Sequence, residues 1–345
     1  MRNPIVSVIL PVYNGENHIS ECIESILSQT YNNFEFIIVD DASTDNTPHL
    51  LKKYAKKDSR IKIITHNSNQ KQTAAANTAC KFAKGKYIAR MDADDVALPF
   101  RLDRQVKYLE SNLDFGLVGS WSDRINNYGK IFDRWIVETN TTYLKWSFLF
   151  QTNFAHASAM MRNNIAKEVG YYQSPEAEDF DLWSRISTIS KIGCIPEILQ
   201  KRRVWEGQLN LKVPAETVNC VHQIIQKNIK LILGKEISLN DVKNIHNVIT
   251  QNDKCLSITK IIETKTLIIE LFNTFLKRNK LNSKEKMLVS KDVAQKLYTL
   301  KLWLDELTKW KGLILFLQIA IINKRFAIYI ILNKILGKKL ISNLF

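Results

Sequence analysis

The chain has 345 residues, of which 45% are hydrophobic and 24% are charged, so its composition excludes a globally disordered protein. Five cysteines without a CxxC pair exclude a disulfide framework and indicate reduced, mostly buried thiols in a cytoplasmic protein. The net charge of +15 is concentrated in residues 210–345, which hold 23 basic and 10 acidic side chains.

The first 111 residues alternate short apolar strands with amphipathic helices. The N-terminus leads directly into the first strand, so we expect no signal peptide. Apolar runs predict strands at residues 5–10, 34–39, 61–65 and 86–91. Helical spacing predicts helices at residues 16–29, 72–83 and 98–111, and one that carries Leu50, Leu51 and Tyr54 after a cap at Asp45 or Thr47. This alternation predicts an α/β fold with a mostly parallel sheet and helices on both faces.

The second part of the chain has a weaker pattern. Further strands are predicted at residues 115–120, 157–161 and 198–204, and a helix with an acidic first turn at residues 178–190. Residues 123–140 alternate strand-like pieces with polar turns and receive no assignment. Beyond residue 210 we expect a helical extension, because glycine and proline become rare there.

Three carboxylates lie within four positions, at Asp92, Asp94 and Asp95, directly after a predicted strand. Like charges this close repel each other, and burial penalises each of them further. A divalent cation relieves this conflict, because Mg²⁺ and Mn²⁺ take oxygen ligands from carboxylates and diphosphates. Open α/β sheets bind ligands at the carboxyl ends of their strands. The acids therefore indicate a metal site at this edge, and the alternative is a set of solvated loop acids.

Several ordered motifs resemble those of family 2 glycosyltransferases. They are Val6–Asn14, Gln29–Tyr31, Phe34–Thr47, Asp92–Asp95, Leu98–Leu102, His156–Arg162 and Glu178–Trp183. The resemblance covers residues 4–208 and extends to bacterial lipooligosaccharide, O-antigen and capsule transferases. It implies a GT-A fold over residues 1–209, with a nucleotide-binding part to about residue 120 and an acceptor part over residues 121–209. It also implies transfer of a sugar to a surface glycan or a lipid-linked oligosaccharide, with inversion.

The implied nucleotide-sugar contacts follow three of the predicted strands. They are Pro11, Tyr13, Asn14, Asp41, Asp92 and Ala93. By this resemblance the Tyr13 loop contacts the base and Asp41 accepts the N3–H of uracil, which implies a UDP-sugar donor. The alternatives are a Tyr13 ring that packs on the next helix and an Asp41 that caps a helix or a turn.

The resemblance also implies a cofactor and a general base. Asp94 and Asp92 would hold Mn²⁺ or Mg²⁺ against the diphosphate, where the cation neutralises charge on the leaving group. Asp95 is either a supporting acid or the cap of the following turn. Asp179 aligns with the base that takes a proton from the acceptor hydroxyl as its oxygen attacks C1 of the sugar. An acidic first helix turn is also explained by the helix dipole.

Other contacts to the diphosphate or the acceptor are implied at His156, Glu178, Trp183, Arg203 and Arg162. Structural alternatives are a satisfied His156 and a Trp183 that belongs to the core. Two departures from the family pattern stand out. Many relatives carry a glycine and an arginine in the segment equivalent to residues 69–77, where this chain has Lys71 and no arginine. Many also place a histidine where this chain has Trp205, which leaves Glu206 or water to complete the metal shell.

Residues 210–345 require a separate explanation, because seven basic residues and no acid follow Glu306. The apolar runs in this tail are shorter than the roughly 20 residues that span a bilayer. Basic helices with apolar faces favour an anionic membrane, so we expect a protein peripheral to the inner face of the cytoplasmic membrane. The alternative is a helical cap on the catalytic domain. Nucleic-acid binding is not expected, because no recognised motif is present.

Two other functions are compatible with parts of the pattern. A catalytically silent protein with the GT-A fold would act as a membrane-surface binding module, and the intact Asp92, Asp94 and Asp179 argue against it. Nucleotidyl transfer to a sugar phosphate would need a glycine-rich phosphate loop after the first strand, which Pro11–Gly15 is not.

Overall fold

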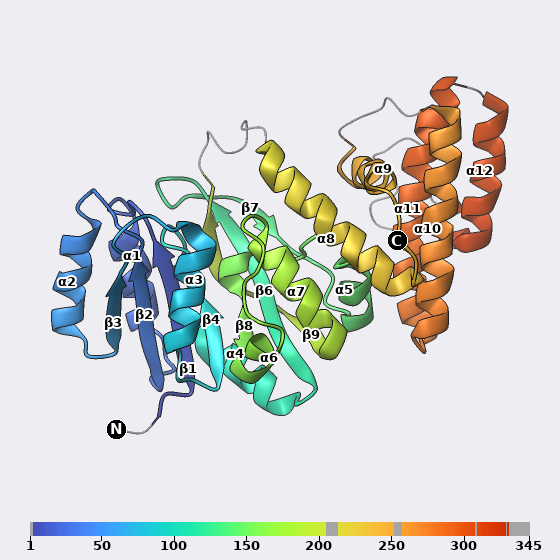
Figure 1. Ribbon diagram of the computed structural model, residues 1–345. Coiled ribbons are helices and arrows are strands. Elements are labelled where there is room, and N and C mark those ends of the chain that lie inside the picture. The colour runs from blue at the N-terminus through green and yellow to red at the C-terminus, as the bar shows by residue number, and fades with distance from the viewer. Residues whose placement is uncertain (1–2, 205–212, 252–256, 308, 329, 331–345) are drawn as a thin grey trace. The chain divides into compact units, whose positions relative to one another are not determined.

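The computed structural model describes residues 3–204, 213–251, 257–307, 309–328 and 330. It contains two compact units, Met1–Val221 and His222–Phe345. The boundary lies within helix α8 (Ala215–Leu233), whereas the sequence places a division after residue 209. The first unit contains the sheet, and the described part of the second unit is helical (Figure 1).

A nine-stranded sheet forms the centre of the first unit. Its strands are β1 (Val6–Val12), β2 (Phe34–Asp40), β3 (Ile61–Thr65), β4 (Tyr87–Arg90), β5 (Val96–Ala97), β6 (Phe115–Ile125), β7 (Ile131–Trp135), β8 (Met160–Arg162) and β9 (Lys191–Arg203). Their order is β3-β2-β1-β4-β8-β6-β9-β5, and β7 pairs with β6. Strands β3, β2, β1 and β4 are parallel, whereas β8 joins β4 antiparallel. The predicted α/β fold is confirmed, and the carboxyl ends of β1, β2 and β4 meet at one edge.

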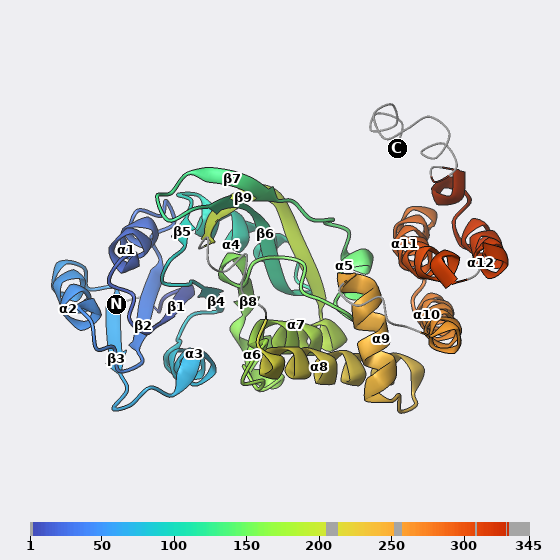
Figure 2. The same cartoon turned by 90° about the horizontal axis from the view of Figure 1, so that it is seen from above.

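Helices cover both faces of the sheet (Figure 2). One face carries α1 (Ile19–Leu27), α2 (Thr47–Lys57) and α4 (Arg101–Ser111), and the other carries α3 (Lys71–Phe82), α5 (Thr141–Ser147), α6 (Asn163–Glu168) and α7 (Glu178–Ile189). Each face has its own apolar core. Leu10 enters the core beneath α1 and Ile9 the core beneath α3, because successive strand side chains point to opposite faces.

Three strands of the acceptor part differ from the prediction. The strand expected at residues 157–161 is a 3₁₀ turn over His156–Ser158 followed by the short β8, because the buried Ser158 hydroxyl donates to the Ala155 carbonyl at 2.8 Å. Strand β9 begins at Lys191, well before residue 198, because it pairs in parallel with β6 along its length. Within the unassigned residues 123–140, β7 is an exposed strand paired with β6.

The second unit is helical, as the sequence predicts. After α8 its helices are α9 (Leu239–Thr250), α10 (Ile258–Arg278), α11 (Ser283–Leu307) and α12 (Lys309–Ile322). Ser238 begins α9 with a capping box, in which its hydroxyl accepts the Asp241 N–H at 3.1 Å. Among the described residues, no helix combines the length and the apolarity needed to cross a bilayer. Lys334, Lys338 and Lys339 of the basic tail lie outside the described residues.

Candidate active site

A cavity of about 610 Å³ opens at the carboxyl edge of β1, β2 and β4. It is lined by the predicted site residues Pro11, Tyr13, Asn14, Asp41, Asp92, Ala93, Asp94 and Arg203. It is also lined by Lys71, which stands where many relatives carry an arginine nearby, and by His18, Arg90 and Arg202, for which the sequence predicts no role. Three loops that lie far apart in the sequence therefore converge on one volume, of a size typical for small-molecule sites.

Asn14 joins the loops that follow β1 and β2. Its side-chain oxygen accepts the Thr44 N–H at 2.8 Å, and its own N–H donates to the Ser43 hydroxyl at 2.9 Å. Asn14 has a left-handed φ of 50°, which asparagine adopts more readily than most residues. The neighbouring Tyr13 is 49% exposed, so about half of its surface is open to a ligand in the cavity.

Asp41 is a buried carboxylate directly after β2. Its Oδ1 lies 2.6 Å from Nδ1 of His66 and accepts the Gln70 N–H at 2.9 Å. Nε2 of His66 lies 3.0 Å from the Thr78 hydroxyl, and this second contact fixes the ring. A carboxylate accepts about four hydrogen bonds, so Asp41 keeps capacity for a donor in the cavity. His66 therefore orients the carboxylate that we expect to contact the base.

Asp92 is paired with a buried cation. Its Oδ1 lies 2.8 Å from Nη2 of Arg90, the last residue of β4. Burial raises the pKa of Asp92, but the charge of Arg90 opposes this rise, with a smaller contribution from Arg202, and the pKa is below its ordinary value. Arg90 therefore keeps the Asp92 carboxylate in its ionised form and fixes its orientation.

Asp95 has a structural role that differs from that of Asp92. It is 3% exposed, and it accepts bonds from the Gln200 amide and from the Arg203 N–H, the latter at 2.8 Å. Burial, followed by the charges of Asp92 and Asp94, raises the pKa of Asp95. Of the two interpretations left open by the sequence, the structure favours the supporting acid, because Asp95 fastens the loop after β4 to β9.

Asp92 and Asp94 are the candidate ligands for a divalent cation. Within the described parts of the chain, no group of three His, Cys, Asp or Glu side chains could hold a metal ion. Mg²⁺ is commonly held by one or two carboxylates together with substrate phosphates, so two carboxylates and a diphosphate form a suitable donor set. Trp205 and Glu206, where a further ligand is considered, lie outside the described residues.

A second pair of acids begins α7. Burial, followed by the charge of Asp179, raises the pKa of Glu178 to about 7. Burial raises the pKa of Asp179 to about 6, although the bond from the Phe180 N–H at 2.7 Å opposes this rise. Neither acid is among the described residues that line the cavity, but the lining residue Gln72 donates to Glu178 at 2.8 Å, so the start of α7 lies beside the cavity. Carboxylates with pKa values near neutral pH are suited to proton transfer.

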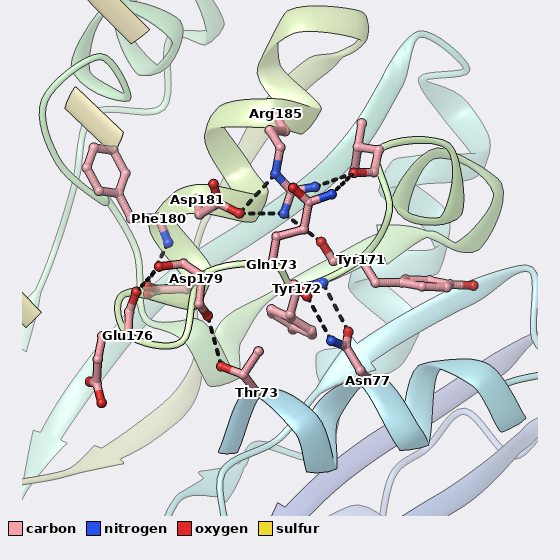
Figure 3. Close-up of polar contacts among 12 residues, drawn as sticks. Thr73, Asn77, Tyr171, Tyr172, Gln173, Glu176, Asp179, Phe180, Asp181 and Arg185 are labelled. Carbon is pink, nitrogen blue, oxygen red and sulfur yellow. Dashed lines mark hydrogen bonds and ion pairs between the residues drawn. The ribbon is translucent and has the colours of Figure 1, made fainter. Parts of the chain in front are cut away.

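The segment before α7 is fastened to α3 and to α7 itself (Figure 3). The Asn77 amide on α3 donates to the Tyr172 carbonyl at 2.8 Å, and its oxygen accepts the Tyr172 N–H at 3.1 Å. On the other side, Arg185 of α7 donates to the Tyr171 carbonyl at 2.6 Å and pairs with Asp181 at 2.6 Å. These bonds fix where α7 begins and therefore where Asp179 lies.

Comparison with known proteins assigns the chain to a family. The model of Glycosyl transferase family 2 matches residues 7–170. The uncharacterized glycosyltransferase MJ1057 of Methanocaldococcus jannaschii is 38% identical over 209 residues, which are 59% of this chain and 72% of that protein. The chain belongs to glycosyl transferase family 2.

Two further likenesses extend this assignment. The UDP-Glc:alpha-D-GlcNAc-diphosphoundecaprenol beta-1,3-glucosyltransferase WfgD of Escherichia coli is 32% identical over 56% of this chain and 75% of that protein. The crystal structure of S. aureus TarS 1-349 in complex with UDP-GlcNAc has a TM-score of 0.57 at 18% identity, over 85% of this chain and 86% of that one. At this identity the second likeness shows the fold alone, and it confirms the expected GT-A architecture.

In this family 2 glycosyltransferase, His156 and Trp183 are not among the described residues that line the cavity. Nε2 of His156 lies 2.9 Å from the Tyr172 hydroxyl, and burial lowers the pKa of His156 to about 3, so the ring is neutral. Trp183 is 2% exposed and packs edge-on against Phe154, with ring centroids 5.1 Å apart. This burial corrects the expectation that Trp183 stacks on a sugar, because no face of its ring is open to a ligand.

The arginines of the predicted site also have structural partners. Arg203 lines the cavity, but its guanidinium donates to the Asp94 carbonyl at 2.8 Å and pairs with Glu21 at 2.6 Å. Arg162 lies at the opposite end of β4 and donates to the Leu109 carbonyl at 2.6 Å, so it is not a phosphate contact in this cavity. Arg202 lines the cavity, and its charge lowers the pKa of Asp92 and of Asp179.

Two residues around the site of this glycosyltransferase, Arg90 and His66, had signals in the sequence that we did not use. Arg90 is a lone cation in the apolar run Tyr87–Met91, and a charge in a buried strand calls for a partner. His66 directly follows β3, at the same sheet edge as Asp41. Lys71, which lines the cavity, has a φ of 69°, in the left-handed region that favours glycine.

Proposed function

We propose that this chain is an inverting, metal-dependent glycosyltransferase that moves a sugar from a UDP-sugar to a hydroxyl of a bacterial surface glycan. The observation that carries the proposal is the convergence of Asp41, Asp92 and Asp94 on one cavity. Asp179 follows Glu178 at the start of α7, and the cavity-lining Gln72 donates to Glu178 at 2.8 Å. These residues would supply one acid that contacts the base, two acids near the diphosphate and one general base, which such a transfer requires.

The donor is proposed from the shape and chemistry of the Asp41 end of the cavity. Tyr13 offers an exposed ring for a base, and Asp41 offers a buried acceptor for the uracil N3–H. WfgD is named as a transferase that uses UDP-Glc, and the TarS structure is a complex with UDP-GlcNAc, which supports a UDP-sugar for this chain. Because His66 and Gln70 already hold Asp41, the carboxylate is oriented before the nucleotide binds.

The diphosphate end is proposed to hold Mn²⁺ or Mg²⁺ through Asp94 and Asp92. When bound, the cation supplies positive charge that stabilises the departing diphosphate. Arg202 is the residue of this chain that we assign to the same diphosphate, because it lines the cavity, whereas Arg203 is bonded to Asp94 and Glu21. The ion pair with Arg90 keeps the Asp92 carboxylate ionised and fixes its orientation.

The transfer itself is a single displacement. Asp179 accepts the proton of the acceptor hydroxyl while that oxygen forms a bond to C1 of the sugar. The bond from C1 to the phosphate oxygen breaks, and UDP leaves with the electron pair. Attack from the face opposite the leaving group inverts the configuration at C1. The bonds of Asn77 and Arg185 to the segment before α7 hold the base in position for this step.

The acceptor is proposed to be presented at the inner face of the cytoplasmic membrane. On α12, Ile314, Leu317 and Ile321 are 61%, 56% and 83% exposed and lie on one helix face, whereas Leu315 and Ile319 are buried. A basic pair, Lys324 and Arg325, follows this face. An exposed apolar stripe beside basic residues is suited to an anionic leaflet. The diphosphoundecaprenol in the name of WfgD supports a lipid-linked acceptor.

The deciding experiment is a donor screen that measures UDP release. UDP-glucose, UDP-galactose and their N-acetyl forms are tested with Mn²⁺ on the wild type and on the Asp94→Ala, Asp179→Asn and Glu178→Gln variants. We expect Asp179→Asn to lower turnover by about 10²- to 10⁴-fold. Asp103→Asn removes an acid on α4 that pairs with Lys107, and it should leave turnover unchanged. The proposal fails if no nucleotide sugar binds or turns over, and full activity of Asp179→Asn would reassign the base.

A further inference from the structure

Arg90 is a cation placed in an apolar layer. Its neighbours Ala89 and Met91 enter the core beneath α1, so the Arg90 side chain projects to the opposite face, toward α3 and α7. Ile88 on that same face packs in the core that contains Ala75, Ala76 and Cys80 of α3. Arg90 is 2% exposed. An arginine is charged at every pH that proteins experience, and removing such a charge from water carries a penalty of several kcal/mol.

Two of the three guanidinium nitrogens of Arg90 lack a hydrogen-bond partner within the described part of the chain. Nη2 pairs with Asp92 at 2.8 Å, whereas Nε and Nη1 are buried and have no hydrogen-bond partner among the residues that the structure describes. Leaving buried donors unpaired is unfavourable, and native structures rarely do so without a reason.

The unpaired donors cannot be relieved by movement of the strand. The Arg90 N–H donates to the Ala159 carbonyl at 3.0 Å, and the Arg90 carbonyl accepts Nη2 of Arg101 at 2.7 Å. Both backbone groups are therefore fixed between β8 and α4. The position of the side chain therefore follows from the fold, and Arg90 is among the residues that line the cavity.

The surroundings of Arg90 indicate which ligand atoms those are. Arg90 lines the same cavity as Asp92, and its side chain projects to the sheet face that α7 covers. Gln72 also lines this cavity and donates to Glu178, at the start of α7, at 2.8 Å. Arg90 is therefore placed beside the acids of the diphosphate end and on the side of the sheet that carries the general base. In a displacement at C1, the atoms between the leaving diphosphate and the base belong to the donor sugar.

Resting on the proposed function above, we propose that Arg90 recognises the donor sugar. Its Nε–H and Nη1–H donate to oxygen substituents of the sugar ring, while Nη2 keeps its pair with Asp92. Arg90 is thus a specificity-determining residue that distinguishes a nucleotide sugar from the free nucleotide. Lysine in its place would keep the charge but not the planar set of donors.

The test measures binding of UDP and of each UDP-sugar of the donor screen by calorimetry on the full chain with Mn²⁺. We expect Arg90→Lys to weaken binding of the UDP-sugar about 10- to 100-fold and to leave binding of UDP within about twofold. Arg162→Lys is the matched control, since Arg162 is also a buried arginine of the sheet but its donors are used by carbonyl groups. It should leave the preference for the UDP-sugar over UDP unchanged.

A second measurement uses the wild type and deoxy analogues of the donor that binds best. An analogue that lacks the oxygen contacted by Arg90 should bind about tenfold more weakly, and Arg90→Lys should add no further loss with that analogue. Equal losses for UDP and UDP-sugar in Arg90→Lys, or a deoxy series without any loss in the wild type, would overturn the inference. A wild type that binds neither UDP nor any UDP-sugar would instead overturn the proposed function.

Discussion

Replacement of Glu178 by glutamine is expected to stabilise this protein above neutral pH. The Glu178 side chain is 14% exposed, and burial followed by the charge of Asp179 raises its pKa from 4.5 to about 7. A carboxyl whose pKa is raised by folding favours the folded state while it is protonated, and its ionisation opposes folding. Each pKa unit corresponds to about 1.4 kcal/mol, so the full penalty is about 3 kcal/mol.

The pH window follows from the same two pKa values. Below pH 4.5 the carboxyl is protonated in the folded and the unfolded chain, and the penalty is absent. It develops as pH rises through this range and is nearly complete above about pH 7. Glutamine does not ionise, and its oxygen still accepts the bond that Gln72 donates to Glu178 at 2.8 Å. The variant should therefore gain little at low pH and about 3 kcal/mol at high pH.

Urea unfolding of the full chain, followed by tryptophan fluorescence near the two ends of this window, measures the difference. The matched control is Glu168→Gln on α6, an exposed carboxylate that should change the free energy of unfolding by less than about 0.5 kcal/mol at either pH. An equal gain at both pH values would show that charge is not the cause. A loss of stability at the higher pH would refute the reasoning outright.

Three further predictions concern the positioning of the site, the recognition of the base and the association with a membrane. Asn77→Ala removes both bonds to the Tyr172 backbone and should lower the free energy of unfolding by about 2 kcal/mol in urea. Turnover should fall while UDP affinity by calorimetry stays constant, and weaker UDP binding would contradict this. His66→Ala should weaken UDP binding about tenfold, since Asp41 loses a charge-assisted bond, and unchanged affinity would remove His66 from base recognition. A third variant replaces the exposed α12 residues Ile314, Leu317 and Ile321 by serine. It should no longer co-sediment with anionic vesicles, while UDP release persists. Retained co-sedimentation would contradict the membrane role.

Much of the nucleotide-binding part can be predicted from local sequence signals. Apolar runs and helical spacing locate β1, β2, β3 and β4 and the helices between them, because a strand with period two and a helix with period 3.6 are local properties. The rule that α/β sheets bind ligands at their carboxyl edge then places Asp41 and the acids after β4 in one region. The acceptor part is less predictable, since β8 is short and β9 is specified mainly by its partner β6.

The sequence by itself determined the alternation of β1 to β4 with their helices, the family and the acids that gather at the sheet edge. Only the tertiary structure decided what each of those acids contacts. The pairing of Asp41 with His66 and the burial of Trp183 are examples. Another example is Arg90, whose Nε and Nη1 have no partner in the described part of the chain. The physical reason is that hydrogen-bond partners and burial depend on the register of strands and the packing of helices that lie far apart in the chain, which no local period encodes.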